Sequence, residues 1–177
     1  MKVEERVLKR VCGSVWLVCA LALMSTPSHA QQAATGGTMT PVERADSAPK
    51  GSLKNPYKES DAAVVKAGQL LFMNYACSGC HGGGGGGGMC PPVTDGVWVY
   101  GGDDDTLFRL VAYGSQILQS KGYSRKAMEN VVAPMPQMGQ VVKTDDDLWR
   151  IITFVRSVYH GPPECKYGCK GSDSSGG

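Results

Sequence analysis

The most constraining feature of this sequence is the pentapeptide Cys77-Ser78-Gly79-Cys80-His81. Two cysteines three residues apart, followed at once by a histidine, form the C-x-x-C-H pattern of covalent haem attachment. One turn of backbone lets both thiols reach the two vinyl groups of one porphyrin, and the next residue then offers its imidazole to the iron. The pattern therefore predicts one covalently bound haem.

A bare C-x-x-C pattern has two other common uses, in thioredoxin-like redox pairs and in zinc sites. The adjoining His81 argues against a redox pair. No second C-x-x-C and no H-x-x-x-H follows in the sequence to complete a zinc site. The remaining alternative is an accidental match in a surface loop, and the features described below argue against it.

Residues 1–30 have the composition of a secretory signal peptide. The start is basic, an apolar run extends from Val11 to Met24, and Ser28-His29-Ala30 forms a small-x-small site before Gln31. The apolar run is short for a membrane span, which needs about 20 apolar residues. We therefore expect cleavage after Ala30, export to the periplasm and no permanent membrane anchor, with an uncleaved anchor as the weaker alternative.

Cleavage leaves three cysteines besides the haem-binding pair: Cys90, Cys165 and Cys169. Three thiols allow one disulfide and one free thiol, and spacing alone does not determine the pairing. Cys165 and Cys169 can close a small loop near the C-terminus, which we slightly favour. Cys90 can instead join the C-terminal tail to the loop after His81. An exported protein meets an oxidising compartment in which such bonds persist.

The mature chain divides into a leader, a folded domain and a tail. Residues 31–55 are polar, rich in Ala, Gly, Thr, Ser and Pro, and lack helical or strand periodicity, so we expect a flexible leader. Residues 56–160 form the predicted domain, and 161–177 a tail that contains Gly, Ser and Cys. A net charge of +2 provides no basic surface for nucleic acid.

Three helices are predicted inside the domain. The first is capped by Ser60 and runs from Asp61 to Ala76, with Gly68 in its middle, where we expect another helix to approach closely. A second helix starts at the acidic triplet 103–105. The last helix opens at Thr144, which begins a pattern that resembles a capping box, and carries a periodic apolar stripe.

Two loops complete the domain. Seven consecutive glycines, 82–88, predict a flexible loop that lets the backbone pass close to the haem edge. The run lacks the G-K-[ST] ending of a nucleotide-binding loop. In Pro134-Met135-Pro136, prolines on both sides disfavour a helix and hold Met135 in a stiff, extended loop.

In the order of these parts, the chain resembles single-haem class I cytochromes c over roughly residues 56–160. The shared order is a helix, C-x-x-C-H, a long loop, helices, a Met-Pro loop and a terminal helix with an aromatic residue near its start. The resemblance implies an all-α fold of about four to five helices around one covalent haem, with long loops. It also implies that the first and last helices cross where Gly68, Phe72 and Trp149 lie.

The same resemblance implies the ligands of the haem. Cys77 and Cys80 would form the thioethers and His81 would be one axial ligand, as in the family. The sixth ligand comes from a methionine in the loop before the terminal helix. Met135 matches best because Met-Pro is the usual dipeptide there. Met138 is the runner-up, and Met89 is a weaker third candidate. In bacteria, the family attaches its haem on the export side, which agrees with the signal peptide.

A finer resemblance concerns the segments Gly-Gly-Gly-Met-Cys-Pro-Pro (86–92), Trp-Val-Tyr-Gly (98–101) and 103–109. They are similar to small cytochromes that accept electrons from quinoprotein alcohol dehydrogenases, which use pyrroloquinoline quinone. The methanol-dehydrogenase cytochromes share the layout, but several of their extensions are missing here. The resemblance implies a quinoprotein dehydrogenase as donor and a downstream cytochrome or oxidase as acceptor.

Two protein ligands close both axial positions of the iron and leave one-electron exchange as its chemistry, so we expect an electron carrier of the respiratory chain and not an enzyme. Three alternatives stay open. The chain could be a permanent haem subunit of a larger dehydrogenase, a ligand-binding or catalytic haem with a labile sixth ligand, or an exported module without haem that is held by disulfides. Arg109 or Trp98 could bond a haem propionate, because each carries a donor in a segment that could pass near the haem.

Overall fold

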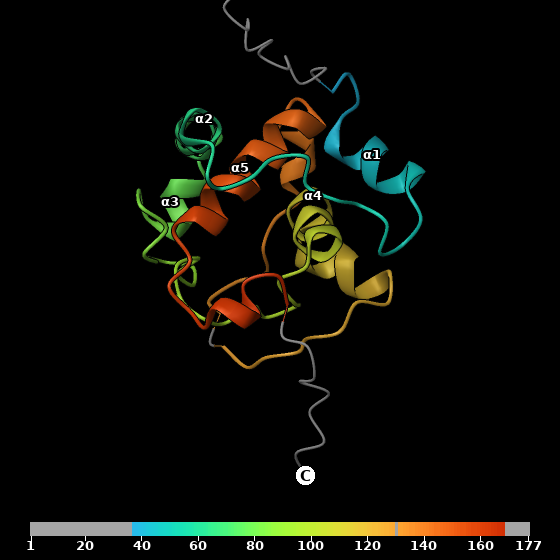
Figure 1. The fold of residues 1–177 in the computed structure, drawn as a ribbon. Helices are drawn as coiled ribbons and strands as arrows, with labels where there is room; N and C mark the ends of the chain where they lie inside the picture. The colour runs from blue at the N-terminus through green and yellow to red at the C-terminus, as the bar shows by residue number, and fades with distance from the viewer. Residues whose placement is uncertain (1–36, 130, 169–177) are drawn as a thin grey trace, which may run out of the picture. The chain divides into compact units, whose positions relative to one another are not determined.

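The computed structural model describes residues 37–129 and 131–168, so the predicted signal peptide and the start of the leader lie outside the described residues. Within them the chain is helical and has no strand (Figure 1). The α-helices are α1 (Pro41–Ser47), α2 (Ala62–Asn74), α3 (Cys77–His81), α4 (Asp104–Ser120) and α5 (Asp145–Ser157); the short 3-10 helices are η1 (Met138–Gln140) and η2 (Pro163–Cys165). The predicted all-α fold is confirmed. None of the described helices is long and apolar enough to cross a membrane.

The first and last predicted helices cross at Gly68, as expected. A Cβ atom at Gly68 would lie 2.0 Å from the carbonyl oxygen of Arg150 in α5, so only glycine allows this approach. Phe72 of α2 and Phe154 of α5 pack beside the crossing with ring centroids 5.3 Å apart. Trp149, expected at the same crossing, instead packs against α4, where its ring centroid is 4.4 Å from that of Phe108.

Each of the three long helices begins at a side chain that caps its free N–H groups. Asp61 caps α2 by accepting hydrogen bonds from Ala63 N and Val64 N, so the cap lies one residue after the predicted Ser60. Asp103 caps α4 through Thr106 N at 2.9 Å. Thr144 caps α5 as predicted, through Asp147 N at 3.1 Å.

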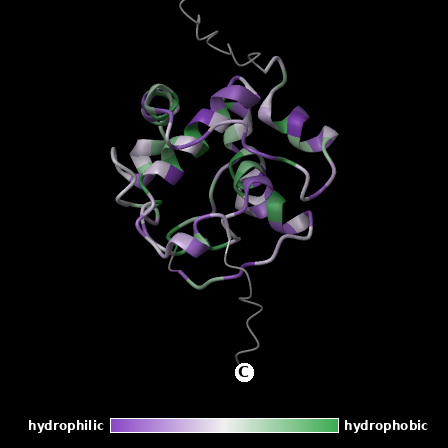
Figure 2. Cartoon of the chain, in the orientation of Figure 1, coloured by the Kyte–Doolittle hydropathy of each residue, from purple (hydrophilic) through white to green (hydrophobic). Residues whose placement is uncertain are grey.

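The buried side chains come mainly from α2, α4 and α5, and Figure 2 shows that each of these helices carries both hydrophobic and hydrophilic residues. The apolar stripe predicted for the last helix is buried at Leu148, Ile151 and Ile152. Beyond α5, Tyr167 donates a hydrogen bond to Glu59 at 2.8 Å, and the guanidinium of Arg156 lies 4.3 Å from the centroid of its ring. The described part of the tail is thus attached to the helical domain.

The prediction of a flexible leader over residues 31–55 is wrong for its described part. Thr40 and Glu43 form a complete capping box at the start of α1, and Ala45 and Leu53 are buried in the core. A helix of seven residues that buries only its proline and one alanine gives no visible periodicity in the sequence. The stabilising partners of this segment lie far along the chain.

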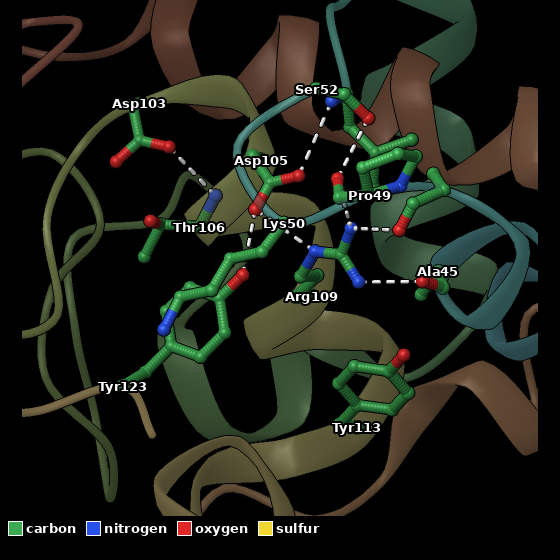
Figure 3. Close-up of polar contacts among 12 residues, drawn as sticks. Ala45, Pro49, Lys50, Ser52, Asp103, Asp105, Thr106, Arg109, Tyr113 and Tyr123 are labelled. Atoms are coloured by element: carbon green, nitrogen blue, oxygen red, sulfur yellow. Dashed lines mark hydrogen bonds and ion pairs between the residues drawn. The ribbon is translucent and has the colours of Figure 1, made fainter. Parts of the chain in front are cut away.

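The main partner is Arg109 of α4, which is buried under the leader (Figure 3). Its guanidinium donates to the carbonyl oxygens of Ala45 at 2.5 Å, Ala48 at 2.9 Å and Pro49 at 3.0 Å. Its Nε donates to Asp105 at 2.9 Å. One buried cation therefore satisfies three main-chain carbonyls in the last turn of α1 and just after it, and fixes the path of the leader over α4.

Candidate haem site

Residues of α2, α3, α4, α5 and their connecting loops line a mostly apolar cavity of about 490 Å³. Cofactor pockets typically measure about 300–1,000 Å³ and combine apolar walls with a few placed polar groups. All four side chains predicted to hold the haem lie on this wall, together with the runner-up methionine: Cys77, Cys80, His81, Met135 and Met138. The fold thus brings together residues more than fifty positions apart in the sequence.

The histidine side of the cavity is built by hydrogen bonds within a short stretch of chain. Ala76 takes a left-handed conformation (φ 59°) that ends the run from α2 and turns the backbone into α3. The amide of Cys90 donates to the carbonyl of Cys80 at 3.0 Å, and the amide of Gly87 donates to that of His81 at 2.8 Å. The glycine run therefore folds back on the C-x-x-C-H segment through its main chain.

The orientation of His81 is set by the same loop. Its Nδ1 lies 2.7 Å from the carbonyl oxygen of Pro91. A carbonyl oxygen only accepts, so Nδ1 carries the proton and Nε2 keeps its lone pair. Metal-bound histidines are commonly held in this way by a carbonyl that fixes both tautomer and ring orientation. The imidazole is prepared to bind a metal through Nε2.

Two of the three methionines proposed as the sixth ligand lie on the other side of the cavity. Met135 and Met138 line the cavity, and Met138 also packs against the hydrophobic core. Met89 is 63% exposed and is absent from the cavity wall, so the structure gives this third candidate no support. It lies in the turn that returns the glycine run to Cys80, which directs its side chain outward.

Comparison with known proteins agrees with this arrangement. The family model for cytochrome c matches residues 65–159, more than half of the chain. The chain belongs to the cytochrome c family. The match includes α3 and the cavity loops, and membership implies a covalently bound haem c and a function in electron transfer.

Two individual proteins are similar to this cytochrome. The Cbb3-type cytochrome c oxidase subunit CcoP of Rhodobacter capsulatus is 40% identical over 58 residues, which are 31% of this chain and 19% of that relative. This cytochrome therefore matches about a fifth of that relative's length. A crystal structure of cytochrome CL from the marine methylotroph Methylophaga aminisulfidivorans is 28% identical, with a TM-score of 0.49, and the match covers 75% of this chain and 74% of that chain.

The polar groups on the cavity wall indicate how the cytochrome could hold a haem propionate. Trp98 lines the cavity, but its indole Nε1 is buried beside Gly102 without a hydrogen-bond partner among the described residues, so this N–H is not open to the cavity. Arg109, the other predicted donor, is not on the wall, because its N–H groups are used under the leader. Arg125 lines the cavity instead, with one N–H bonded to the carbonyl of Glu129 at 2.8 Å. Sequence reasoning missed Arg125 because no motif surrounds it.

The thiols of Cys77 and Cys90 are protonated at neutral pH. Burial raises the pKa of Cys77 to about 11, and burial together with the neighbouring Cys80 raises that of Cys90 to about 11. Cys90 also lies on the cavity wall.

The disulfide predictions are partly resolved. Cys77, Cys80 and Cys90 are free thiols, and Cys165 is disulfide-bonded. The alternative in which Cys90 joins the C-terminal tail is therefore wrong. Hydrogen bonds between the amide of Cys90 and Cys80, and between the amide of Gly88 and Cys90, hold this residue in the haem-side loop. Cys169 lies outside the described residues.

These observations together fit a haem c. The cavity has mostly apolar walls, two neighbouring thiols for thioether bonds, an imidazole with Nε2 free, thioether sulfurs from the Met-Pro loop, and the cationic Arg125 for a carboxylate. The haem, when bound, supplies one-electron redox chemistry at its iron. The chain supplies the ligands, the orientation of the imidazole and a mostly apolar environment.

Proposed function

We propose that this cytochrome is a periplasmic one-electron carrier. Its haem is attached through Cys77 and Cys80, and its iron is held by His81 and Met135. The observation that carries this proposal is that all four side chains line one apolar cavity and that Pro91 already orients the imidazole. Met138, which packs on the core as well, is the alternative sixth ligand.

This ligand set determines the chemistry. A six-coordinate iron has no open position for oxygen or peroxide, so electron exchange remains. A methionine ligand and an apolar pocket both favour ferrous iron and raise the reduction potential. Ligands fixed by the fold also change little between the two oxidation states, which favours rapid electron transfer.

The first test is the visible spectrum of the reduced, mature holoprotein with and without carbon monoxide. We expect no change on adding the gas, because His81 and Met135 occupy both axial positions. The same measurement on a Met135→Ala variant should show a carbon monoxide complex. A complex in the wild type, formed readily and completely, would indicate a labile sixth position and a ligand-binding or catalytic haem.

For the electron donor, we propose a quinoprotein alcohol dehydrogenase, on the sequence similarity of residues 86–92, 98–101 and 103–109. The domain from residue 56 to residue 160 carries nine Lys/Arg and ten Asp/Glu, so long-range charge steering is weak. Exposed valines at the cavity wall support an apolar, transient contact near the haem: Val97, Val131 and Val132.

The donor is tested with a purified pyrroloquinoline-quinone-dependent alcohol dehydrogenase by stopped-flow reduction of the cytochrome. Val132, which is 78% exposed on the cavity wall, is changed to Asp, and the matched control is Val141→Asp, 52% exposed and away from that wall. We expect Val132→Asp to slow reduction severalfold with an unchanged spectrum, and the control to behave like the wild type. A steep fall of the rate with salt, or equal effects of both variants, would contradict this docking mode.

Export is part of the proposal, on the composition of residues 1–30. We expect the protein in the periplasmic fraction with Gln31 as its first residue. N-terminal sequencing of the purified holoprotein tests this directly. A chain that retains residues 1–30 and sediments with membranes would support the uncleaved anchor.

A further inference from the structure

Helix α4 is broken at one residue, and the break faces the Met-Pro loop. Gly114 has φ 73° and ψ 167°, far from helical values. In a continuous helix the amide of Ser115 would donate to the carbonyl of Val111. Here it donates to the carbonyl oxygen of Met135 at 3.0 Å. The break thus redirects a main-chain donor from the helix to the proposed ligand residue.

The side chain of Ser115 makes a second contact with the same residue. Its Oγ accepts a hydrogen bond from the amide of Met135 at 3.0 Å, and Ser115 is buried on the cavity wall. Proline lacks an N–H group, so Met135 provides the one main-chain donor of the tripeptide Pro134-Met135-Pro136. Ser115 therefore satisfies both main-chain polar groups of Met135.

Gly114 leaves the space for this pairing. A Cβ atom at Gly114 would lie 2.6 Å from the carbonyl oxygen of Met135, 2.7 Å from the carbonyl carbon of Pro136 and 2.8 Å from the amide nitrogen of Gln137. All three are backbone atoms, which cannot rotate away as a side chain could. The positive φ of Gly114 also favours glycine over any other residue.

We propose that Gly114 and Ser115 form a clamp on the backbone of Met135 that determines how firmly its thioether holds the haem iron. The inference rests on the proposed role of Met135 as the sixth ligand. Ser115 is a positioning residue here, because it touches the ligand's backbone and not the iron. The clamp explains how a loop with prolines on both sides keeps one fixed position against a helix.

Removing the hydroxyl leaves the amide of Met135 without its partner at a partly buried position. A donor left without a partner there is unfavourable, and the loop can relieve this by moving the amide toward water. The bound state of the thioether then becomes less favourable relative to the detached state. An external ligand such as imidazole, which competes with the thioether for ferric iron, therefore binds more tightly.

The test uses the full-length ferric holoprotein and imidazole titrations followed in the visible spectrum. We expect Ser115→Ala to increase imidazole affinity about tenfold, which equals about 1.4 kcal/mol, and to weaken the methionine-to-iron absorption band. Ser115→Thr keeps the hydroxyl and should restore the wild-type affinity. The matched control is Ser120→Ala, an exposed serine of the same helix whose hydroxyl bonds only to the carbonyl of Ile117. Wild-type affinity in Ser115→Ala would overturn the clamp.

A Met135→Ala variant separates this outcome from a failure of the ligand assignment. If the methionine band persists in that variant, Met135 is not the ligand and the proposed site is wrong. If the band disappears there but Ser115→Ala binds imidazole like the wild type, only the clamp is wrong. Amide hydrogen exchange of Met135 in the wild type needs no variant: slow exchange is expected, and rapid exchange would contradict the clamp.

Discussion

The two halves of the haem site are held in different ways. Around His81, the partners are sequence neighbours: the amide of Cys90 donates a hydrogen bond to the carbonyl of Cys80, and the imidazole donates one to the carbonyl of Pro91, ten residues away. Around Met135, the partner is Ser115, twenty residues earlier, which requires a broken helix to present it. The first half is a property of one segment, and the second is a property of the assembled fold.

The methionine half also depends on the leader. The loop that carries Met135 continues into η1, where a Cβ atom at Gly139 would lie 2.6 Å from the carbonyl of Ala112 and 2.9 Å from Val42 of the leader. The methionine loop thus contacts α4 on both sides of its break and touches α1. We therefore expect damage to the leader or to α4 to affect methionine ligation before histidine ligation.

The largest expected effect distinguishes covalent attachment of the haem from binding of its iron by methionine. Replacing both Cys77 and Cys80 by Ala should abolish covalent haem entirely, because no thiol remains in the attachment segment. Met135→Ala should keep full covalent attachment, since its segment takes no part in the thioether bonds. Haem staining after denaturing electrophoresis measures both. Haem staining of the double variant, or loss of staining in Met135→Ala, would contradict the assignment of covalent attachment to the cysteine segment alone.

The next effect concerns the leader. Arg109→Met should lower the free energy of unfolding by about 3 kcal/mol, because it leaves the buried carboxylate of Asp105 and the carbonyls of Ala45 and Ala48 without their cation. Denaturant unfolding measures this loss. The methionine band should weaken at lower denaturant concentration than in the wild type, while the histidine stays bound.

The control for this variant is Lys121→Met. Lys121 forms an ion pair with Asp46 at 3.2 Å, but its side chain is 42% exposed and that of Asp46 is 54% exposed. A surface pair of this kind contributes at most about 1 kcal/mol. If both variants lost the same stability, the leader would be held by general packing and not by the buried guanidinium.

These differences explain what the sequence could and could not predict. The pattern around His81, the cap at Thr144 and the stripe of α5 depend on near neighbours, so the sequence displays them. The leader helix was missed because its main partner, Arg109, lies 64 residues from Ala45. For the same reason Arg109 was one of the two candidates for bonding a haem propionate, since a lone arginine does not reveal its partners.

The break of α4 is the clearest example of a feature that the sequence could not predict. The apolar face from Leu107 to Ser115 predicts a continuous helix, and Gly114 within it signals only a weaker helix former. The reason for that glycine is the backbone of Met135 and Pro136, which approaches from another segment. Such an approach is a tertiary contact without a local sequence signal.

A smaller effect tests a long-range contact of α2, the helix that leads into the histidine half. Gly68→Ala should lower the free energy of unfolding by about 2 kcal/mol, because its Cβ would meet the backbone of Arg150 at 2.0 Å and force α2 and α5 apart. The gain of about 1 kcal/mol in helix propensity offsets only part of this cost. The control is Gly79→Ala in α3, where a Cβ would have no neighbour within 4 Å. Thermal unfolding that ranks the control below Gly68→Ala would contradict the close crossing.

The smallest effect has the opposite sign and concerns the turn before the haem motif. Ala76 is the one non-glycine residue with positive φ in the described part of the chain. A left-handed conformation costs an L-residue about 1–2 kcal/mol, and the greater freedom of an unfolded glycine returns roughly half of that. Ala76→Gly should therefore stabilise the holoprotein by about 0.5–1 kcal/mol. Ala67→Gly, inside α2, should destabilise it by about 1 kcal/mol. If both changes destabilised the protein, contacts with the rest of the fold would hold the turn at Ala76. The histidine half would then depend on distant segments more than its hydrogen bonds indicate.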